Sequence, residues 1–177
     1  MMRLNPRSLF QQRGFTLMEL LIGVSILAIL LSVAVPSFSQ MMRRNRLATA
    51  VNELVTALNL GRSEAYKRGL PVSVCATDSS QASCPSTPNW ANGWIVFVDT
   101  NGDGLRTSTE TIIQNYSAVN NISVTTASAA VTFNPVGVSS ATSLVVKPTS
   151  CVAAAPEKRT ITIATTGRIG LDKGNCP

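Results

Sequence analysis

Histidine is absent from the 177 residues of this chain, and charged residues make up only 14% of it. Without histidine the chain cannot form a serine–histidine or cysteine–histidine nucleophilic pair, or a metal site with histidine ligands. It also lacks a glycine-rich phosphate-binding loop, so we expect a protein that is not an enzyme. The charged fraction lies well below the roughly 25% of ordinary soluble domains, which indicates a long apolar segment.

That apolar segment lies near the N-terminus. Residues 1–13 are polar and include three arginines but no acid, whereas residues 15–35 are apolar almost without a break. As a helix, this stretch spans about 31 Å, which matches the core of a bilayer. A secretory signal has a shorter apolar core and a small-residue cleavage site after it, and neither is found here. We therefore predict one membrane-spanning helix at 15–35 that remains in the protein.

One carboxylate, that of Glu19, lies inside the apolar segment. An acidic side chain in this position costs on the order of 2–3 kcal/mol unless it reaches the interface or finds a partner. Glu19 ends the sequence Gly14-Phe15-Thr16-Leu17-Met18-Glu19, which follows the short basic leader. This motif resembles the processing site of type IV prepilins.

The resemblance implies a role for each of these residues. Residues 1–14 would be a leader peptide that a prepilin peptidase removes between Gly14 and Phe15, and Phe15 would then be N-methylated. Glu19 would pair with the new N-terminal ammonium of a neighbouring subunit when the helices bundle in a filament. Such a pair would fix the axial register, because an unpaired buried charge is strongly disfavoured.

Four cysteines indicate which side of the membrane the rest of the chain occupies. Arginines flank both ends of the apolar segment, so the positive-inside rule does not decide the orientation. All four cysteines follow the segment, and an even number on one side suggests disulfides in an oxidising compartment. The spacing favours Cys75–Cys84 and Cys151–Cys176, with the two crossed connectivities as alternatives. We therefore expect the C-terminal part to be periplasmic or extracellular. The resemblance to prepilins implies a single-pass inner-membrane protein with a periplasmic C-terminus that joins a pilus at the cell surface.

Beyond the membrane segment, helical periodicity continues through Pro36 over residues 36–69 and gives way to β-branched runs. The helix carries an apolar stripe at helical spacing, formed by Leu47, Val51, Leu54, Val55 and Leu58. Polar turns then separate short runs that predict an antiparallel β domain over 70–177. The expected strands are 71–76, 93–99, 111–116, 122–125, 130–133, 143–147, 159–164 and 167–171. The predicted fold is therefore α+β, a long helix packed on an antiparallel sheet.

Three further motifs resemble the GspH/FimT/FimU group of minor pilins and pseudopilins. They are Arg62-Ser63-Glu64-Ala65, Gly93-Trp94-Ile95-Val96-Phe97-Val98-Asp99 and Phe133-Asn134-Pro135-Val136-Gly137. The resemblance implies a minor type IV pilin in the assembly-priming or tip complex, which supports pilus biogenesis, adhesion and twitching motility. The implied partners are other minor pilins, the major pilin, the prepilin peptidase, the inner membrane and its assembly platform. The alternatives are a DNA-binding minor pilin for DNA uptake and a GspH-like pseudopilin of type II secretion.

The segment that follows residues 93–99 is a candidate calcium site. Asp99, Asn101, Asp103 and Glu110 match the pattern D-x-[DN]-x-[DN]-G-x5-E, whose oxygen ligands suit a hard cation. However, a strand precedes this loop where an EF-hand has a helix, and its two Asx-Gly pairs are hairpin-turn signals. We favour a structural turn, with calcium as the alternative; no other cofactor is expected.

A basic group near the C-terminus is a candidate for contact with DNA. Gly167-Arg168 resembles the beginning of the Gly-Arg-x-Arg motif of DNA-binding pilins of the FimT kind, although Gly170 replaces the second arginine. Clustered cations are what phosphate contacts require. The cations concerned are Arg168, Lys173, Lys158 and Arg159. A solvated hairpin is the interpretation that we favour for this segment.

Overall fold

The computed structural model describes residues 14–85 and 89–177. It divides into two units, Met1–Gln40 and Met41–Pro177, which we describe separately. One helix, α1 (Leu17–Arg68), contributes to both units and continues through Pro36 as expected. Of the predicted leader, only Gly14 belongs to the described residues.

The first unit consists of the apolar part of α1. Its side chains are exposed from Phe15 to Ser39, and the most apolar window of the helix has a mean hydropathy of 2.5. Within the described residues, α1 is the one helix long and apolar enough to cross a membrane by length and composition. The long exposed apolar surface therefore fits the predicted membrane segment at 15–35.

The second unit contains two antiparallel sheets rather than one continuous sheet. One sheet has the strand order β3-β2-β1-β5 and the other has the order β4-β6-β7-β8. The elements are β1 (Val72–Ala76), the 3₁₀ turn η1 (Trp90–Asn92), β2 (Gly93–Val98), β3 (Ile112–Ser117), β4 (Ile122–Thr126), β5 (Ala130–Phe133), β6 (Thr142–Pro148), β7 (Lys158–Ile163) and β8 (Ile169–Gly174). Each of the eight strands overlaps one of the ranges expected from the sequence.

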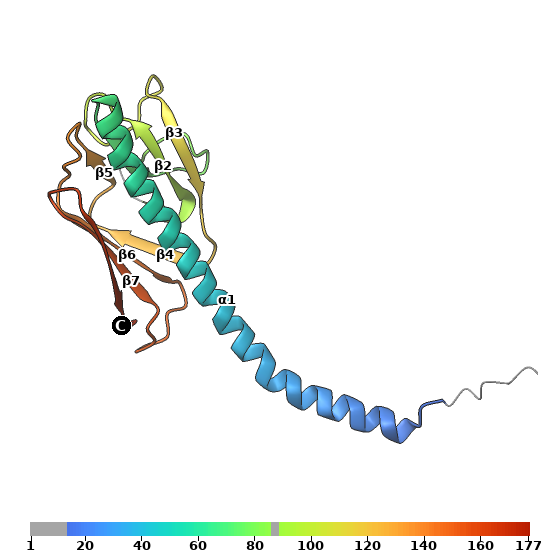
Figure 1. Cartoon of the computed structure of the whole chain (residues 1–177). Coiled ribbons are helices and arrows are strands. Elements are labelled where there is room, and N and C mark those ends of the chain that lie inside the picture. The colour runs from blue at the N-terminus through green and yellow to red at the C-terminus, as the bar shows by residue number, and fades with distance from the viewer. Residues whose placement is uncertain (1–13, 86–88) are drawn as a thin grey trace, which may run out of the picture. The chain divides into compact units, whose positions relative to one another are not determined.

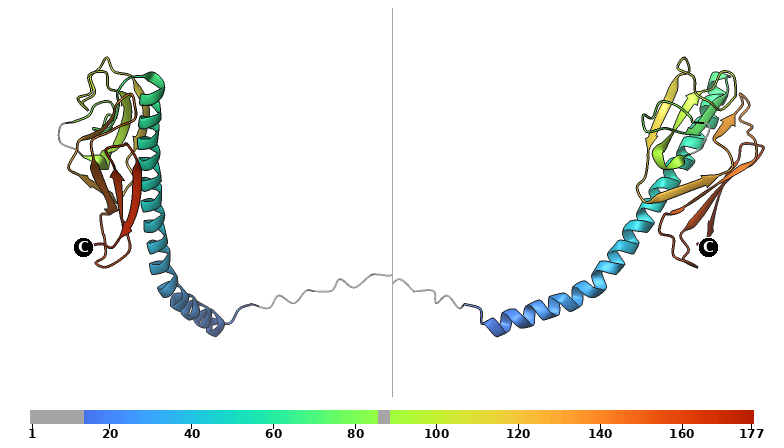
Figure 2. Two further views of the ribbon diagram at one scale, coloured as in Figure 1. Left: turned by 60° about the vertical axis from the view of Figure 1, so that its left-hand side comes forward. Right: turned by 180° about the vertical axis from the view of Figure 1, so that it is seen from behind.

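The C-terminal part of α1 covers the inner faces of these strands (Figures 1 and 2). Leu47, Val51, Leu54 and Leu58 of the predicted stripe are buried, and Val55 is half-buried. They pack in one core with Trp90, Trp94 and Phe133, which are among the largest buried side chains of the sheet side. Full burial of a leucine or valine stabilises a fold by roughly 1.5–3 kcal/mol, so the stripe accounts for the attachment of the helix to the sheets.

The structure contains both disulfides that the cysteine spacing favours. Cys75 in β1 is bonded to Cys84, nine residues later, and Cys151 is bonded to Cys176, 25 residues later. The first bond closes the loop that follows β1 at its base. The second bond ties the segment before β7 to the end of the chain, so the β7–β8 hairpin is closed at both ends.

Candidate functional site

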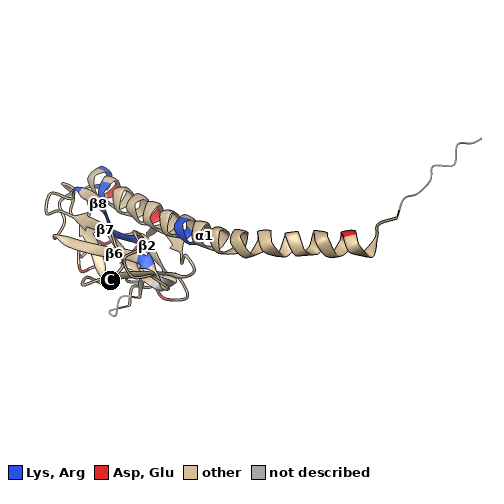
Figure 3. Cartoon of the chain, turned by 90° about the horizontal axis from the view of Figure 1, so that it is seen from below, with Lys and Arg blue, Asp and Glu red and all other residues tan. Residues whose placement is uncertain are grey.

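Glu19 and Thr16 form a capping box at the N-terminus of α1. The hydroxyl of Thr16 accepts a hydrogen bond from the backbone N–H of Glu19 at 3.2 Å, and Glu19 Oε2 accepts one from the backbone N–H of Thr16 at 3.1 Å. Two N–H groups at the helix end are thereby satisfied. Figure 3 shows this acidic position near the beginning of α1. The T-x-x-E spacing could have predicted the cap, but the sequence reasoning considered Glu19 only as an interface or pairing residue.

Glu19 nevertheless retains the chemistry that its predicted pairing role needs. It is the only charged residue between Phe15 and Met42, and its carboxylate is exposed in the single chain. The capping box uses one carboxylate oxygen, Oε2. Its position, four residues after the predicted new N-terminus at Phe15, places a negative charge at the positive end of the helix dipole.

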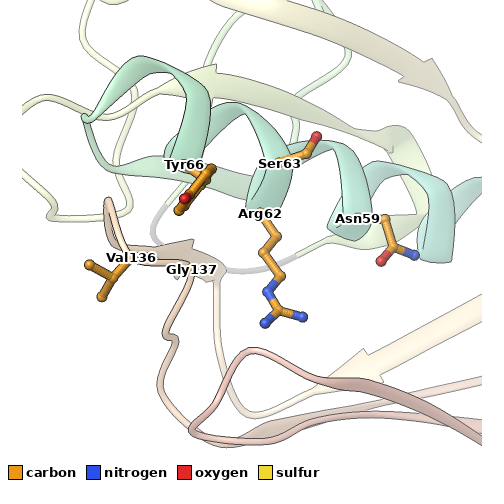
Figure 4. A pocket seen from close by; sticks show the side chains of 6 residues that line it. All are labelled: Asn59, Arg62, Ser63, Tyr66, Val136 and Gly137. Atoms are coloured by element: carbon orange, nitrogen blue, oxygen red, sulfur yellow. The ribbon is translucent and has the colours of Figure 1, made fainter.

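Arg62 joins three stretches of sequence that are far apart in the chain. It extends from α1 toward the loop that follows β5 (Figure 4), and its Nη2 donates a hydrogen bond to the carbonyl oxygen of Thr166 at 3.2 Å. Gly137 and Gly167 have positive φ angles of 77° and 71°. A Cβ atom on either glycine would lie 3.2 or 3.1 Å from Arg62 Nε, and one on Gly167 would lie 1.9 Å from the carbonyl oxygen of Gly137. Glycine at both positions therefore lets two turns close around the arginine.

This junction borders a hollow of about 440 Å³ on the surface of α1. The amide of Asn59 and the hydroxyl of Ser63 donate to helix carbonyl groups, so Arg62 is the charged group that lines the hollow. Tyr66 and Val136 lie beside it with 74% and 71% of their surface exposed. Sequence reasoning missed this site because no local pattern connects Arg62 to the two distant glycines.

The candidate calcium loop is a hydrogen-bonded turn. Asp99 is fully buried, its Oδ1 accepts from the N–H of Gly102 at 2.8 Å, and its Oδ2 accepts from the N–H of Gly104 at 2.9 Å and from the hydroxyl of Ser73 at 2.6 Å. Asn101 and Asp103 bond to each other at 2.8 Å. These bonds hold the loop in a closed turn.

Glu110 closes the same loop from its far end. Its Oε1 accepts from the N–H of Thr100 and its Oε2 from the N–H of Thr107, both at 2.9 Å. Burial raises the pKa of Glu110, but these backbone hydrogen bonds outweigh it and hold the pKa below its ordinary value. Arg106, from the same loop, donates to the carbonyl oxygens of Glu110 and Ala82. No group of three or more acidic or cysteine side chains in the described residues could hold a metal ion. The geometry therefore describes a hydrogen-bonded turn, and calcium binding at this loop stays a prediction.

The four cations of the DNA hypothesis do not form one patch. Arg159 in β7 and Lys173 in β8 are directly paired across the strands. Lys158 neighbours Arg159 in the strand, so its side chain points to the opposite face. Arg168 precedes β8 at the other end of the hairpin, about 16 Å away at the usual strand rise. The structure thus unites two of the four predicted residues and separates Arg168 from them.

Arg159 and Lys173 belong instead to a groove between α1 and the β7–β8 hairpin. The groove has a volume of about 470 Å³, and Arg44, Leu47, Glu157 and Leu171 also line it. Glu157 is only 2% exposed and forms ion pairs with Arg43 at 3.2 Å and Arg44 at 3.8 Å. The burial of Glu157 could not be predicted from local sequence, because the pairing depends on how the helix meets the segment before β7.

Comparisons with known proteins agree with this architecture. Residues 50–167 match the family model of the type II transport protein GspH, and residues 9–35 match the prokaryotic N-terminal methylation motif. A fimbrial protein of Pseudomonas aeruginosa is 38% identical over 66 residues, which are 37% of this chain and 42% of that protein. The match thus covers less than half of that relative's length.

Solved structures show the same fold. Two crystal forms of the type IV minor pilin FimU of Pseudomonas aeruginosa superpose on this chain with TM-scores of 0.57 and 0.53. The sequence identities are 19% and 18%, and the superpositions cover 75% and 71% of this chain and 92% and 91% of the FimU chains. At these identities the likeness concerns the fold alone.

Proposed function

This chain belongs to the GspH family, and on that premise we propose that it is a minor type IV pilin that joins the assembly-priming or tip complex of a pilus. One observation carries the proposal. A methylation motif that ends on Glu19 opens an exposed apolar helix, and the same helix continues into a β domain of the GspH family. A protein built in this way is suited to leave a membrane and enter a helical filament through its N-terminal half.

The proposed mechanism starts with processing. The peptidase cuts between Gly14 and Phe15 on the cytoplasmic side and methylates Phe15, which leaves a chain anchored by residues 15–35 with the β domain in the periplasm. The new ammonium of one subunit then pairs with Glu19 of its neighbour. In the apolar surroundings of a helix bundle, an unpaired charge is costly, so only the register that pairs the two charges is stable.

The β domain supplies the surface that distinguishes this subunit from the major pilin. Tyr66 and Val136 are exposed beside the Arg62 junction, and large exposed side chains next to a half-buried arginine are typical of protein contacts. We therefore place a contact with a neighbouring minor pilin at this end of α1.

Type II secretion is the second candidate function. The family model that matches residues 50–167 is that of a type II transport protein, and the same helix and sheets suit a pseudopilus. DNA uptake has weaker support, because Arg168 lies apart from Arg159 and Lys173. The adhesion and motility of the pilus would follow from its assembly.

A deletion strain distinguishes the candidates. The minor-pilin proposal predicts loss of twitching motility and of surface pili, with protein secretion unchanged, and recovery when the wild-type gene is returned. Loss of secretion with intact pili would overturn it in favour of the pseudopilin, and loss of transformation alone would favour DNA uptake.

A further inference from the structure

We propose that the groove between α1 and the β7–β8 hairpin binds the phosphate headgroup of an anionic phospholipid, and that it holds the β domain at the membrane surface before assembly. This proposal rests on the membrane anchoring in the proposed function. The volume of the groove, about 470 Å³, lies in the range of small-ligand pockets. Its lining combines cations with the apolar side chains of Leu47 and Leu171, which suits a headgroup attached to a glycerol ester.

The charges around the groove favour an anion. Arg43 and Arg44 share one buried carboxylate, that of Glu157. Arg159 uses its Nη1 to bond the carbonyl oxygens of Pro156 and Lys158, at 2.9 and 2.8 Å, so no carboxylate neutralises it there. Neither Arg159 nor Lys173 forms an ion pair in the part of the chain that the structure describes. The four cations and one carboxylate therefore leave a positive groove, and a phosphate would supply the missing negative charge.

The neighbouring acid does not cancel this charge. Asp172 precedes Lys173 in β8, and successive side chains of a strand point to opposite faces. Asp172 is accordingly paired with Thr160, whereas Lys173 is paired with Arg159. Two cations directly opposite each other on one face repel, and this arrangement is destabilising unless an anion lies between them.

The position of the groove in the chain selects a lipid as the source of the phosphate. Arg44 follows Val35, the last residue of the apolar run, by only nine residues of the same helix. Clusters of cations that follow a membrane segment attract anionic lipid headgroups. Arginines on the translocated side also oppose the positive-inside rule, and binding of an anionic lipid would account for their position.

Native mass spectrometry of the full chain tests the proposal. The chain is released from detergent micelles that contain equal amounts of phosphatidylglycerol and phosphatidylcholine, and the retained lipids are counted. We expect the wild type to retain phosphatidylglycerol about 25-fold more often than phosphatidylcholine, because Arg159 and Lys173 each contribute about fivefold. Lys173→Gln should lower this preference by about fivefold, and Arg159→Gln with Lys173→Gln should abolish it.

A control of equal charge separates the groove from the overall charge of the chain. Lys67→Gln with Lys147→Gln removes two cations outside the groove lining, and Arg68 still pairs with Glu64 at 2.8 Å. This double variant should keep the wild-type preference. Since Arg159 also braces backbone carbonyls, Lys173→Gln alone keeps the test valid if the double variant fails to fold. Equal retention of both lipids by the wild type, or an equal loss in the two double variants, would overturn the proposal.

The result is independent of the proposed function. Lipid retention in micelles requires neither processing nor a filament. A chain that is processed and recovered in pili but shows no lipid preference overturns the lipid site alone. A chain that prefers phosphatidylglycerol but never enters pili overturns the pilin role alone.

Discussion

Replacing Gly167 by alanine should lower the free energy of unfolding of the β domain far more than the same change at Gly102. Both residues have nearly the same backbone conformation, with φ of 71° and 72°. A Cβ on Gly102 meets nothing within 4 Å, whereas one on Gly167 would lie 1.9 Å from the carbonyl oxygen of Gly137. Comparing Gly102→Ala with Gly167→Ala therefore separates two losses in the free energy of unfolding. One comes from the left-handed conformation, and the other from the close approach of the two turns.

The magnitudes follow from these contacts. Alanine in the left-handed region costs roughly 1–2 kcal/mol, partly offset by about 0.4–1 kcal/mol because the unfolded chain loses freedom. Gly102→Ala should thus lower the free energy of unfolding by about 1 kcal/mol. In Gly167→Ala the turn must also move away from Gly137, which breaks the Arg62–Thr166 hydrogen bond and the bond from Ser139 N–H to Thr165 O. At about 1 kcal/mol for each bond, we expect a total loss of about 3 kcal/mol.

Urea unfolding of the full chain in detergent, followed by tryptophan fluorescence, measures both losses. Trp90 and Trp94 are buried in the core, so their emission reports its exposure. In thermal unfolding, Gly167→Ala should lower the Tm by about 10 °C, roughly three times the effect of Gly102→Ala. Equal losses in the two variants would refute the inferred contact between the two turns.

Three further predictions concern the other sites. Glu19→Gln keeps a side chain that can cap the helix but removes the charge, so this variant should be processed normally and yet be absent from sheared pili. Thr16→Ala removes the cap hydroxyl and keeps the charge, so it should still be incorporated. Immunoblots of pilus fractions that show the reverse pattern would contradict the pairing role. Calcium at millimolar concentration should leave the Tm of the full chain unchanged, because the oxygens of Asp99 and Glu110 already accept hydrogen bonds. A clear rise of the Tm in calorimetry would support the calcium site instead. The lowered pKa of Glu110 stabilises the folded state at pH values above the unfolded-state pKa of about 4.3, and this contribution is lost as the pH falls through the folded-state pKa. The difference in unfolding free energy between wild type and Glu110→Gln should therefore shrink from pH 6 to pH 3. A constant difference would contradict the role of the hydrogen bonds from Thr100 and Thr107 to Glu110.

Local patterns predicted the elements of the fold well. The spacing of Leu47, Val51, Leu54 and Leu58 identified the buried face of α1, because a helix brings every third or fourth residue to one side. The β-branched runs located the strands for a similar reason. The division into two sheets was not predicted, since strand order depends on contacts between segments that are distant in the sequence.

Long-range contacts also explain what was missed at the sites. Arg62 meets Gly137 and Gly167 only after α1 has packed against both turns, and Glu157 is buried only where it meets Arg43 and Arg44. The basic group near the C-terminus was predicted from proximity in the sequence, which overlooks the antiparallel hairpin that moves Arg168 to the opposite end from Lys173.

The capping box is a different case, because its signal is local. Thr16 and Glu19 have the T-x-x-E spacing of a helix N-terminus, and the same two residues belong to the processing motif. In the single chain this carboxylate caps its own helix, and we propose that in the filament it receives the ammonium of a neighbour.

Mass spectrometry of this subunit from sheared, purified pili gives the most direct test of its role as a processed filament subunit. The account predicts an N-terminal peptide that begins with N-methylated Phe15 and lacks all of residues 1–14. Recovery of chains that still begin at Met1, or absence of the subunit from pili that are otherwise intact, would contradict it.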